Sequence, residues 1–228
     1  MQDFKANILK TGSSGNCLIL SDVLALDMGV TYKTVALYVR SLQLVFVSHE
    51  HGDHFKASTI RTLARNRPSL RFCGGPWMIS RFMEAGVSKA NIDVLEAGKR
   101  YDYGAFQIEP VPLFHNVPNF GLKIYMNGKK AIYIVDTGNV DGIEAKNFDL
   151  ILLEANHHRA EIEARIAAKQ AAGEFAYEEE AARNHLSYEQ AMDWIAANAG
   201  PESRYVLLHQ HQERKSYGTP GTADRGLA

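Results

Sequence analysis

The stretch VSHEHGDH, Val47–His54, contains three histidines, a glutamate and an aspartate within six residues and follows an apolar run. His49 and His51 are two residues apart at the end of a predicted strand, so their imidazole rings are expected to point to the same side. Imidazole and carboxylate ligands together are typical of hydrolytic metal sites that keep an open coordination position, whereas structural zinc sites favour cysteine. The stretch therefore predicts a catalytic metal site.

Two more candidate ligands follow in the same loop. Gly52 is expected to let the chain turn sharply, which places Asp53 and His54 near the start of a predicted helix. A simpler interpretation is a charged turn in which Asp53 caps that helix. The whole chain has nine histidines among 228 residues, so three within six residues argue for a metal site.

The composition is that of an ordinary globular protein, with 46% hydrophobic and 22% charged residues. The formal net charge of −1 shows no general basic excess, so binding to nucleic acid would need a local basic patch. The candidates for such a patch are Arg61, Arg65, Arg67 and Arg71. Cys17 and Cys73 form no CxxC pair, which argues against a disulfide framework and against a cysteine zinc site.

The ends of the chain and its hydropathy predict a location. The N-terminal segment lacks the apolar core of a signal peptide, and nowhere do about 18 apolar residues follow one another. We therefore expect a cytoplasmic protein without membrane association, folded as a single domain over residues 1–228. Residues 216–228, SYGTPGTADRGLA, are expected to form a flexible tail. The sequence identifies no protein partner.

Short apolar runs separated by turn signals predict more strands than helices. Strands are expected at residues 4–9, 17–21, 23–29, 42–48, 92–98, 105–115, 120–128, 129–138, 148–156 and 204–209. Helices are expected at residues 31–41, 55–68, 76–86, 159–183 with a break at Gly173, and 186–200. Asn127-Gly128 is a strong hairpin signal. This pattern indicates two sheets covered by helices.

The motif HEHGDH, residues 49–54, resembles the HxHxDH signature of the metallo-β-lactamase superfamily. Order and strand context agree further along the chain, at His115 in VPLFHN, Asp136 in YIVDTG and His209 in YVLLHQ. The resemblance covers roughly Ile8–Gln210. It implies the α/β (α+β) class, a four-layered αββα metallo-β-lactamase sandwich, with a dinuclear metal centre along one edge of the paired sheets.

The same resemblance implies a division of the ligands between two ions. One ion is held by His49, His51 and His115, the other by Asp53, His54 and His209, and Asp136 bridges them. Zn²⁺ is expected, although Mn²⁺ and Fe²⁺ accept the same nitrogen and oxygen ligands.

Each of the three distal residues also has another interpretation. His115 alone fits an ordinary histidine at a strand end, and His211 competes with His209 as the last ligand. Asp136 with the following Thr and Gly fits a turn. The same triplet occurs in aspartic proteases, but that fold would leave HEHGDH unexplained.

Three motifs outside the ligand set are similar to the small single-domain phosphodiesterase and exonuclease branch of the superfamily (WalJ/YycJ-like), and more distantly to ribonuclease Z. They are GSSGNCLIL at residues 12–20, LLEANHH at 152–158 and RNHLSYEQA at 183–191. In that branch a histidine before a small hydroxyl residue, here His185 before Ser187, lies beside the metals. The chain lacks the glycine- and proline-rich arm of ribonuclease Z, which argues against tRNA maturation.

The function predicted from these features is a dinuclear metal-dependent hydrolase, a phosphodiesterase or nuclease resembling DNA exonucleases. Its nucleophile is a metal-bridging hydroxide, and its substrate is a nucleic acid or another phosphodiester. Asp53 is expected to orient the nucleophile and Asp136 to fix the metal spacing. His185 is expected to protonate the leaving alkoxide or to hold a phosphoryl oxygen. The alternatives are a metal-dependent hydrolase of a small ester, thioester or lactone, and a non-catalytic metal-binding module.

Three further residues are candidates for substrate binding. Ser14 and Asn16 lie in a loop whose hydroxyls and amides suit a phosphate, although the loop fits a hairpin equally well. Ser187 precedes a predicted helix with Gln190 three residues later, which predicts a capping box at a helix end that suits an anion.

Overall fold

The computed structural model describes residues 3–210 and the strand residues 217–218, and the chain divides into two compact units. The units are, first, Met1–Tyr101 with Val117–Phe120 and, second, Asp102–Asn116 with Gly121–Ala228. Most of the predicted tail, residues 216–228, lies outside the described residues, and so does His211. No helix in the described part of the chain is long and apolar enough to cross a membrane.

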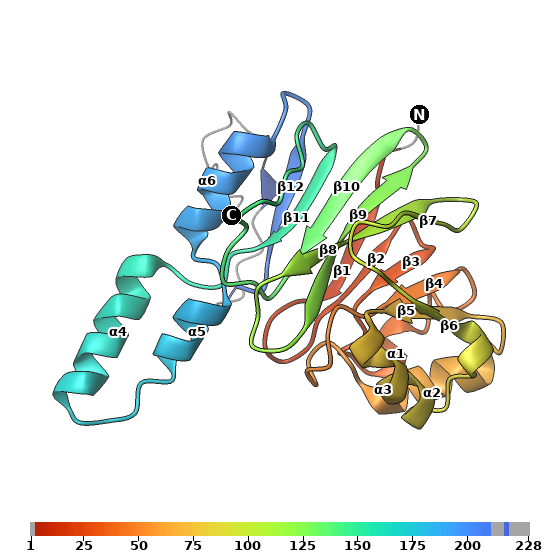
Figure 1. Cartoon of the computed structure of the whole chain (residues 1–228), viewed down its shortest axis with the longest axis horizontal. Helices are drawn as coiled ribbons and strands as arrows, with labels where there is room; N and C mark the ends of the chain where they lie inside the picture. Colours follow the sequence, from red (N-terminus) through yellow and green to blue (C-terminus); the bar gives the residue numbers. More distant parts are fainter. Residues whose placement is uncertain (1–2, 211–216, 219–228) are drawn as a thin grey trace. The chain divides into compact units, whose positions relative to one another are not determined.

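The first unit contains a six-stranded mixed sheet (Figure 1). Its strands, in spatial order, are β1 (Ala6–Lys10), β2 (Cys17–Leu20), β3 (Leu24–Leu26), β4 (Leu44–Phe46), β5 (Arg71–Gly74) and β6 (Ile92–Val94). The pairs β1–β2 and β2–β3 are antiparallel, and β3 to β6 are parallel to one another. Parallel neighbours need crossover connections, and here these contain the helices of the unit.

Those connecting helices are α1 (Tyr32–Val35), α2 (Ala57–Asn66), the 3-10 turn η1 (Pro76–Met78), α3 (Ile79–Glu84) and the 3-10 turn η2 (Lys89–Asn91). Side chains of α2 and α3, including Ile60, Leu63 and Phe82, share one buried core with the strand residues Ile19 and Val45. The helices therefore cover one face of this sheet. The predicted helix at 31–41 is reduced to the single turn of α1.

The other sheet is mixed and has seven strands, which belong to the second unit except at Tyr101, Asn119 and Phe120. Its strands, in spatial order from one edge of the sheet to the other, are β7 (Tyr101–Asp102), β8 (Gln107–Leu113), β9 (Asn119–Met126), β10 (Lys129–Ile134), β11 (Leu150–Glu154), β12 (Arg204–Leu208) and β13 (Tyr217–Gly218). β9 and β10 form the predicted hairpin, with φ of 53° at Asn127 and 76° at Gly128. Two positive φ values in succession are the mark of a type I′ turn. β10, β11 and β12 are parallel to one another.

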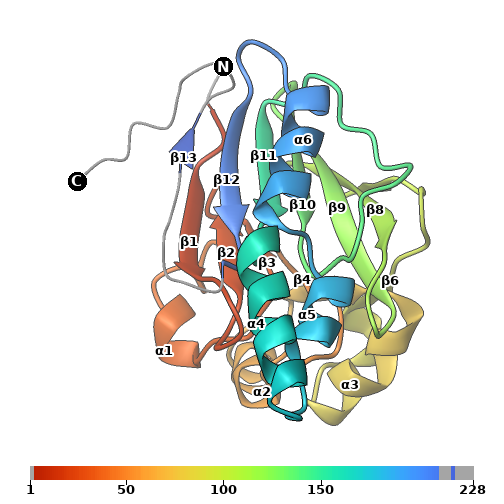
Figure 2. The ribbon, with the colours of Figure 1, turned by 90° about the vertical axis from the view of Figure 1, so that its left-hand side faces the viewer.

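Three helices, α4 (Arg159–Ala171), α5 (Glu178–Asn184) and α6 (Tyr188–Asn198), belong to the second unit. α6 lies over the sheet in Figure 2, and Ala191, Trp194 and Ile195 of this helix share a core with residues of β10 to β12. α4 and α5 form a hairpin that extends away from this sheet (Figure 1), with only Ile162 of α4 buried. The hairpin starts soon after β11, and His185 directly follows its last helical residue.

Candidate metal centre

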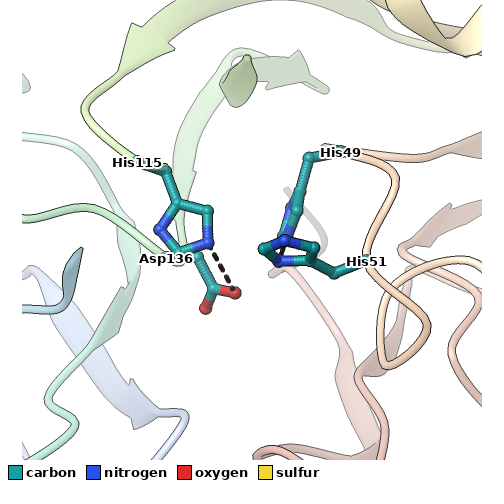
Figure 3. A group of neighbouring side chains, drawn as sticks. All are labelled: His49, His51, His115 and Asp136. Carbon is teal, nitrogen blue, oxygen red and sulfur yellow. Dashed lines mark hydrogen bonds and ion pairs between the residues drawn. The ribbon is translucent and has the colours of Figure 1, made fainter. Parts of the chain in front are cut away.

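His49 and His51 lie in the loop that follows β4 (Figure 3). Nε2 of His49 and Nδ1 of His51 are 3.0 Å apart, and the two ring planes meet at 80°. A histidine nitrogen binds zinc at about 2.0–2.1 Å, so two nitrogens at this separation suit one shared cation. This geometry agrees with the expectation that the imidazole rings of His49 and His51 point to the same side.

Asp53 and His54 lie at the other end of the same loop, where Oδ2 of Asp53 is 3.3 Å from Nε2 of His54. The expectation that Gly52 makes a sharp turn possible is wrong, because its φ is outside the left-handed range and an added Cβ would meet nothing within 4 Å. The N-cap of α2 is Lys56, without a side-chain capping bond. Asp53 is therefore not a helix cap.

A buried network lies behind these histidines and was not anticipated from the sequence. Asp27 follows β3, and its Oδ2 is 2.7 Å from Nδ1 of His54. The hydroxyl of Ser48 donates to the same oxygen at 3.0 Å and is 2.9 Å from Nδ1 of His49. All four side chains are buried. The signal for Asp27 is a carboxylate that ends a wholly apolar strand, VLALD, which is costly unless the carboxylate has donors.

Asn16 joins the loop after β1 to the candidate ligands. Its Nδ2 is 2.8 Å from Nε2 of His54 and donates to Oδ2 of Asp53 at 3.2 Å, and the residue is buried. Ser14 is exposed, and its carbonyl accepts a hydrogen bond from Lys10. Asn16 thus contacts two predicted ligands, while its contact with a substrate stays a prediction.

In the second unit, Asp136 follows β10 and has a φ of 54°. Nε2 of His115 is 3.9 Å from Oδ2 of Asp136, the contact that is dashed in Figure 3. Nδ1 of His115 is 3.2 Å from the carbonyl of Asn184, which accepts its proton. This bond leaves Nε2 as the nitrogen with the lone pair, which is the state that binds metal.

The residues after Asp136 hold three segments of the second unit together. The hydroxyl of Thr137 accepts from the amide of Phe114 at 3.0 Å, beside His115. A Cβ on Gly138 would lie 2.0 Å from the carbonyl of Arg183, so only glycine fits this close approach to the end of α5. The Asp-Thr-Gly triplet therefore has a structural role that has nothing to do with an aspartic protease.

Glu154, at the end of β11, is a residue of this site that the sequence did not single out. Its Oε1 accepts from the amides of Thr137 and Leu186, at 2.6 and 3.2 Å. Its Oε2 is 3.0 Å from Nδ1 of His185 and 3.5 Å from Nδ1 of His209. The carboxylate is fully buried and joins both histidines to Asp136, whose Oδ1 is 3.0 Å from Nδ1 of His209.

The two carboxylates change the protonation of their histidines. Burial lowers the pKa of His209, but attraction to Asp136 and Glu154 outweighs it and raises the pKa to about 10. Burial likewise opposes the charge on His185, and the hydrogen bond to Glu154 raises the pKa of its imidazole. Burial raises the pKa of Glu154, yet its bonds to the two histidines hold that pKa below its usual value. This cluster of side chains in the second unit therefore favours a positive charge.

Ser187 is the N-cap of α6, and the predicted capping box is confirmed. Its hydroxyl accepts from the amide of Gln190 at 3.2 Å, and the side chain of Gln190 accepts from the amide of Ser187 at 3.0 Å. Ser187 is buried. Its hydroxyl is used by the helix, and contact with a substrate stays a prediction.

Ser187→Ala is expected to lower the free energy of unfolding by about 1 kcal/mol, the usual cost of losing an N-cap. Urea unfolding of the two proteins measures the difference. Ser187→Asn keeps a capping oxygen and is expected to retain most of the stability. A loss well above about 2 kcal/mol would show that the hydroxyl does more than cap α6.

The structure brings the predicted site residues together within each unit. His49, His51, Asp53, His54 and Asn16 lie together in the first, and His115, Asp136, His185 and His209 in the second. Two of the four arginines proposed as a basic patch already bind other groups of the protein. Arg67 donates to the carbonyls of Val39, Arg40 and Leu42, and Arg71 pairs with Asp93.

Comparisons with known proteins give a family and a fold. A family model described as "Beta-lactamase superfamily domain" matches residues 31–210, whereas no curated protein sequence matches the chain. The metallo-beta-lactamase fold protein YhfI from Bacillus subtilis is 17% identical, with a TM-score of 0.71 over 91% of this chain and 86% of that one. Human tRNase Z, short form, is 18% identical, with a TM-score of 0.67 over 90% and 92%. Zn²⁺-bound PqqB from Methylobacterium extorquens is 11% identical, with a TM-score of 0.65 over 90% and 88%. At such identities the likeness shows a shared fold and no more.

Proposed function

The chain belongs to the metallo-β-lactamase superfamily, and on that premise we propose that it is a dinuclear metal-dependent phosphodiesterase that acts on nucleic acid. The predicted α/β class with its αββα sandwich is confirmed by the family and by the shared fold. Members of this superfamily are generally metal-dependent hydrolases. The choice of a phosphodiester, and of two ions, is the part that we propose.

The donor atoms of each unit fit divalent metal ions. Nδ1 of His54 is bonded to Asp27, Nδ1 of His49 to Ser48 and Nδ1 of His115 to the carbonyl of Asn184. A hydrogen bond from the second ring nitrogen is the usual support of a metal-binding histidine. We propose that the two units act as one domain and share the ions, with the ligands His49, His51 and His115 for one, Asp53, His54 and His209 for the other, and Asp136 for both.

The observation that carries the proposal is the pair formed by His185 and Glu154. A fully buried carboxylate holds Nδ1 of His185 at 3.0 Å, and the histidine is 3.8 Å from Asp136 while 15% of its side chain stays exposed. A histidine oriented by a carboxylate is the arrangement of general acid catalysis. A phosphodiester releases an alkoxide, which needs a proton, and we propose that this histidine gives it.

Each residue of the proposed site would have its own role in the reaction. Two bound divalent ions supply Lewis-acid chemistry, which lowers the pKa of water from 15.7 toward about 7. Asp53 would orient the attacking oxygen, and Asp136 would fix the spacing between the two groups of ligands. His185 would hold a proton on its exposed nitrogen and deliver it to the leaving oxygen, while Glu154 keeps the ring in place.

A substrate panel with the metal-loaded protein tests the proposal. We expect hydrolysis of bis(4-nitrophenyl) phosphate and of end-labelled single-stranded DNA or RNA, lost with a chelator and restored by Zn²⁺ or Mn²⁺. Human tRNase Z, whose fold is similar, makes RNA a necessary arm of the panel. Hydrolysis of carboxylic esters, thioesters or lactones alone would replace the phosphodiesterase assignment. A metal-loaded protein inert on every class would indicate a non-catalytic metal-binding module. The cytoplasmic location stays a prediction.

A further inference from the structure

We propose that Ser48 is a positioning residue that fixes the tautomer of the metal-binding His49 by connecting it to Asp27, the buried carboxylate that also fixes the tautomer of His54 by a direct bond. His49 and His54 are assigned to different ions, so a single buried carboxylate would orient one ligand in each ion site. The consequence for metal binding rests on the proposed function, whereas the tautomers themselves are a property of the metal-free chain. All the residues involved belong to the first unit.

The tautomer of His54 follows from Asn16. The amide of Gly12 donates to Oδ1 of Asn16 at 2.8 Å, which settles which end of the side-chain amide is the oxygen. Nδ2, which has only protons to give, is therefore the atom 2.8 Å from Nε2 of His54. Nε2 must accept, so the proton of a neutral His54 lies on Nδ1, where Oδ2 of Asp27 receives it at 2.7 Å.

The tautomer of His49 follows from the one proton of the Ser48 hydroxyl. That hydroxyl is 3.0 Å from Oδ2 of Asp27 and 2.9 Å from Nδ1 of His49. A carboxylate only accepts, so the proton of Ser48 must be given to Asp27. The hydroxyl oxygen is then left to accept from Nδ1 of His49, which places the lone pair of that ring on Nε2.

The direction of the whole network is therefore determined. Nδ1 of His49 donates to Ser48, and Ser48 donates to Asp27, while Nδ1 of His54 donates to the same carboxylate oxygen. The amide of Ser48 also donates to the other oxygen of Asp27 at 2.8 Å and holds the carboxylate in place. Both histidines thus present Nε2 lone pairs, and Nε2 of His49 is the atom 3.0 Å from His51.

The two histidines depend on Ser48 to different degrees. His54 contacts Asp27 directly, and its 3.4 Å approach to the Ser48 hydroxyl is a weak addition. His49 is connected to the carboxylate through Ser48. Removal of the hydroxyl therefore takes away the bond between Ser48 and Nδ1 of His49 and weakens the support of this ring, while His54 keeps its direct bond to Asp27.

Histidine nitrogen NMR of the metal-free protein tests the tautomers without any variant. Long-range proton–nitrogen spectra distinguish a protonated Nδ1 from a protonated Nε2. We expect the Nδ1-protonated form for both His49 and His54. A protonated Nε2 on neutral His49 would overturn the proposal, whether or not the protein binds metal.

Metal affinity tests the consequence. In Ser48→Ala we expect the ion held by His49 to bind about 10–100-fold more weakly, the usual effect of losing a bond behind a ligand, and the other ion to change less. Ser48→Thr keeps a hydroxyl and is expected to restore affinity. Competition with a chelator, followed by metal analysis, gives both constants.

Thr59→Val is the matched control, because Thr59 is equally buried in the same unit and donates only to the carbonyl of Val30. It is expected to cost stability but no metal affinity. Equal affinities in Ser48→Ala and the unaltered protein, or an equal loss at both ions, would overturn the proposal. A chain with the expected tautomers that binds no metal would refute the proposed function and leave the assigned network intact.

Discussion

Asp136→Ala is expected to remove bound metal and phosphodiesterase activity together. Asp136 is the one ligand assigned to both ions, and in its own unit it already lies 3.0 Å from His209 and 3.9 Å from His115. Loss of a bond behind a ligand costs about 10–100-fold in affinity or rate, so loss of a shared ligand should cost more than about 10³-fold. Metal analysis after gel filtration and rates on bis(4-nitrophenyl) phosphate measure the two effects.

Asp141→Ala is the control for this variant. Asp141 is an exposed aspartate in the loop that follows Asp136, and it is expected to change neither the metal content nor the rate. Asp136→Asn keeps the shape of the side chain but lacks the charge, and it should bind metal weakly. An Asp136→Ala protein that holds its metal and turns over at a normal rate would contradict the dinuclear assignment.

The proposed ligands are the part of the candidate site that a sequence predicts best. HEHGDH is dense enough to be recognised alone, and its spacing agrees with the short distances within the loop after β4. His115, Asp136 and His209 are recognised through the order of their strands. The fold could be predicted for the same reason, because short apolar runs and the Asn127-Gly128 turn are local signals.

The supporting residues could not be assigned from the sequence, because their partners are far away along the chain. Asp27 lies 27 positions before His54 and Glu154 lies 31 before His185, so no local pattern connects them. Each is a carboxylate that ends a buried apolar strand, which signals a need for donors without saying which donors. Ser48 has no sequence signal of its own, because its role depends on Asp27, which lies 21 positions earlier.

The misjudged details have local causes. The sequence predicts that Gly52 lets the chain turn sharply, but the φ of Gly52 lies outside the left-handed range, and the turn is closed by the bond from the amide of His54 to the carbonyl of His51. The helix expected at 31–41 has apolar residues at suitable spacing, but only Tyr32–Val35 is helical. Leu37 is 92% exposed, whereas Val35 and Val39 are buried in the core of the first unit, so the segment packs against that core without forming a full helix.

The last prediction separates the proposed proton donor, His185, from the proposed ligands. In His185→Ala the metal content is expected to stay unchanged, while the rate on an oligonucleotide falls about 10²–10⁴-fold, the usual contribution of a general acid. On bis(4-nitrophenyl) phosphate the loss should be much smaller, because 4-nitrophenolate leaves without needing a proton. The ratio of the two losses therefore reports the role of His185 in a way that a general structural defect does not.

The control variant for His185→Ala lies in the same unit. His158→Ala removes an exposed histidine that contacts Glu189 at 3.3 Å, and it is expected to leave both rates unchanged. Donor atoms of Asp136, Glu154, His185 and His209 all lie within 4.8 Å of one another, so His185 has a second conceivable role as a ligand. Loss of metal from His185→Ala would establish that role, and equal losses on the two substrates would exclude proton donation to the leaving group. Retained metal with a loss confined to the alkoxide substrate is the outcome that makes His185, held by Glu154, the general acid of a phosphodiesterase.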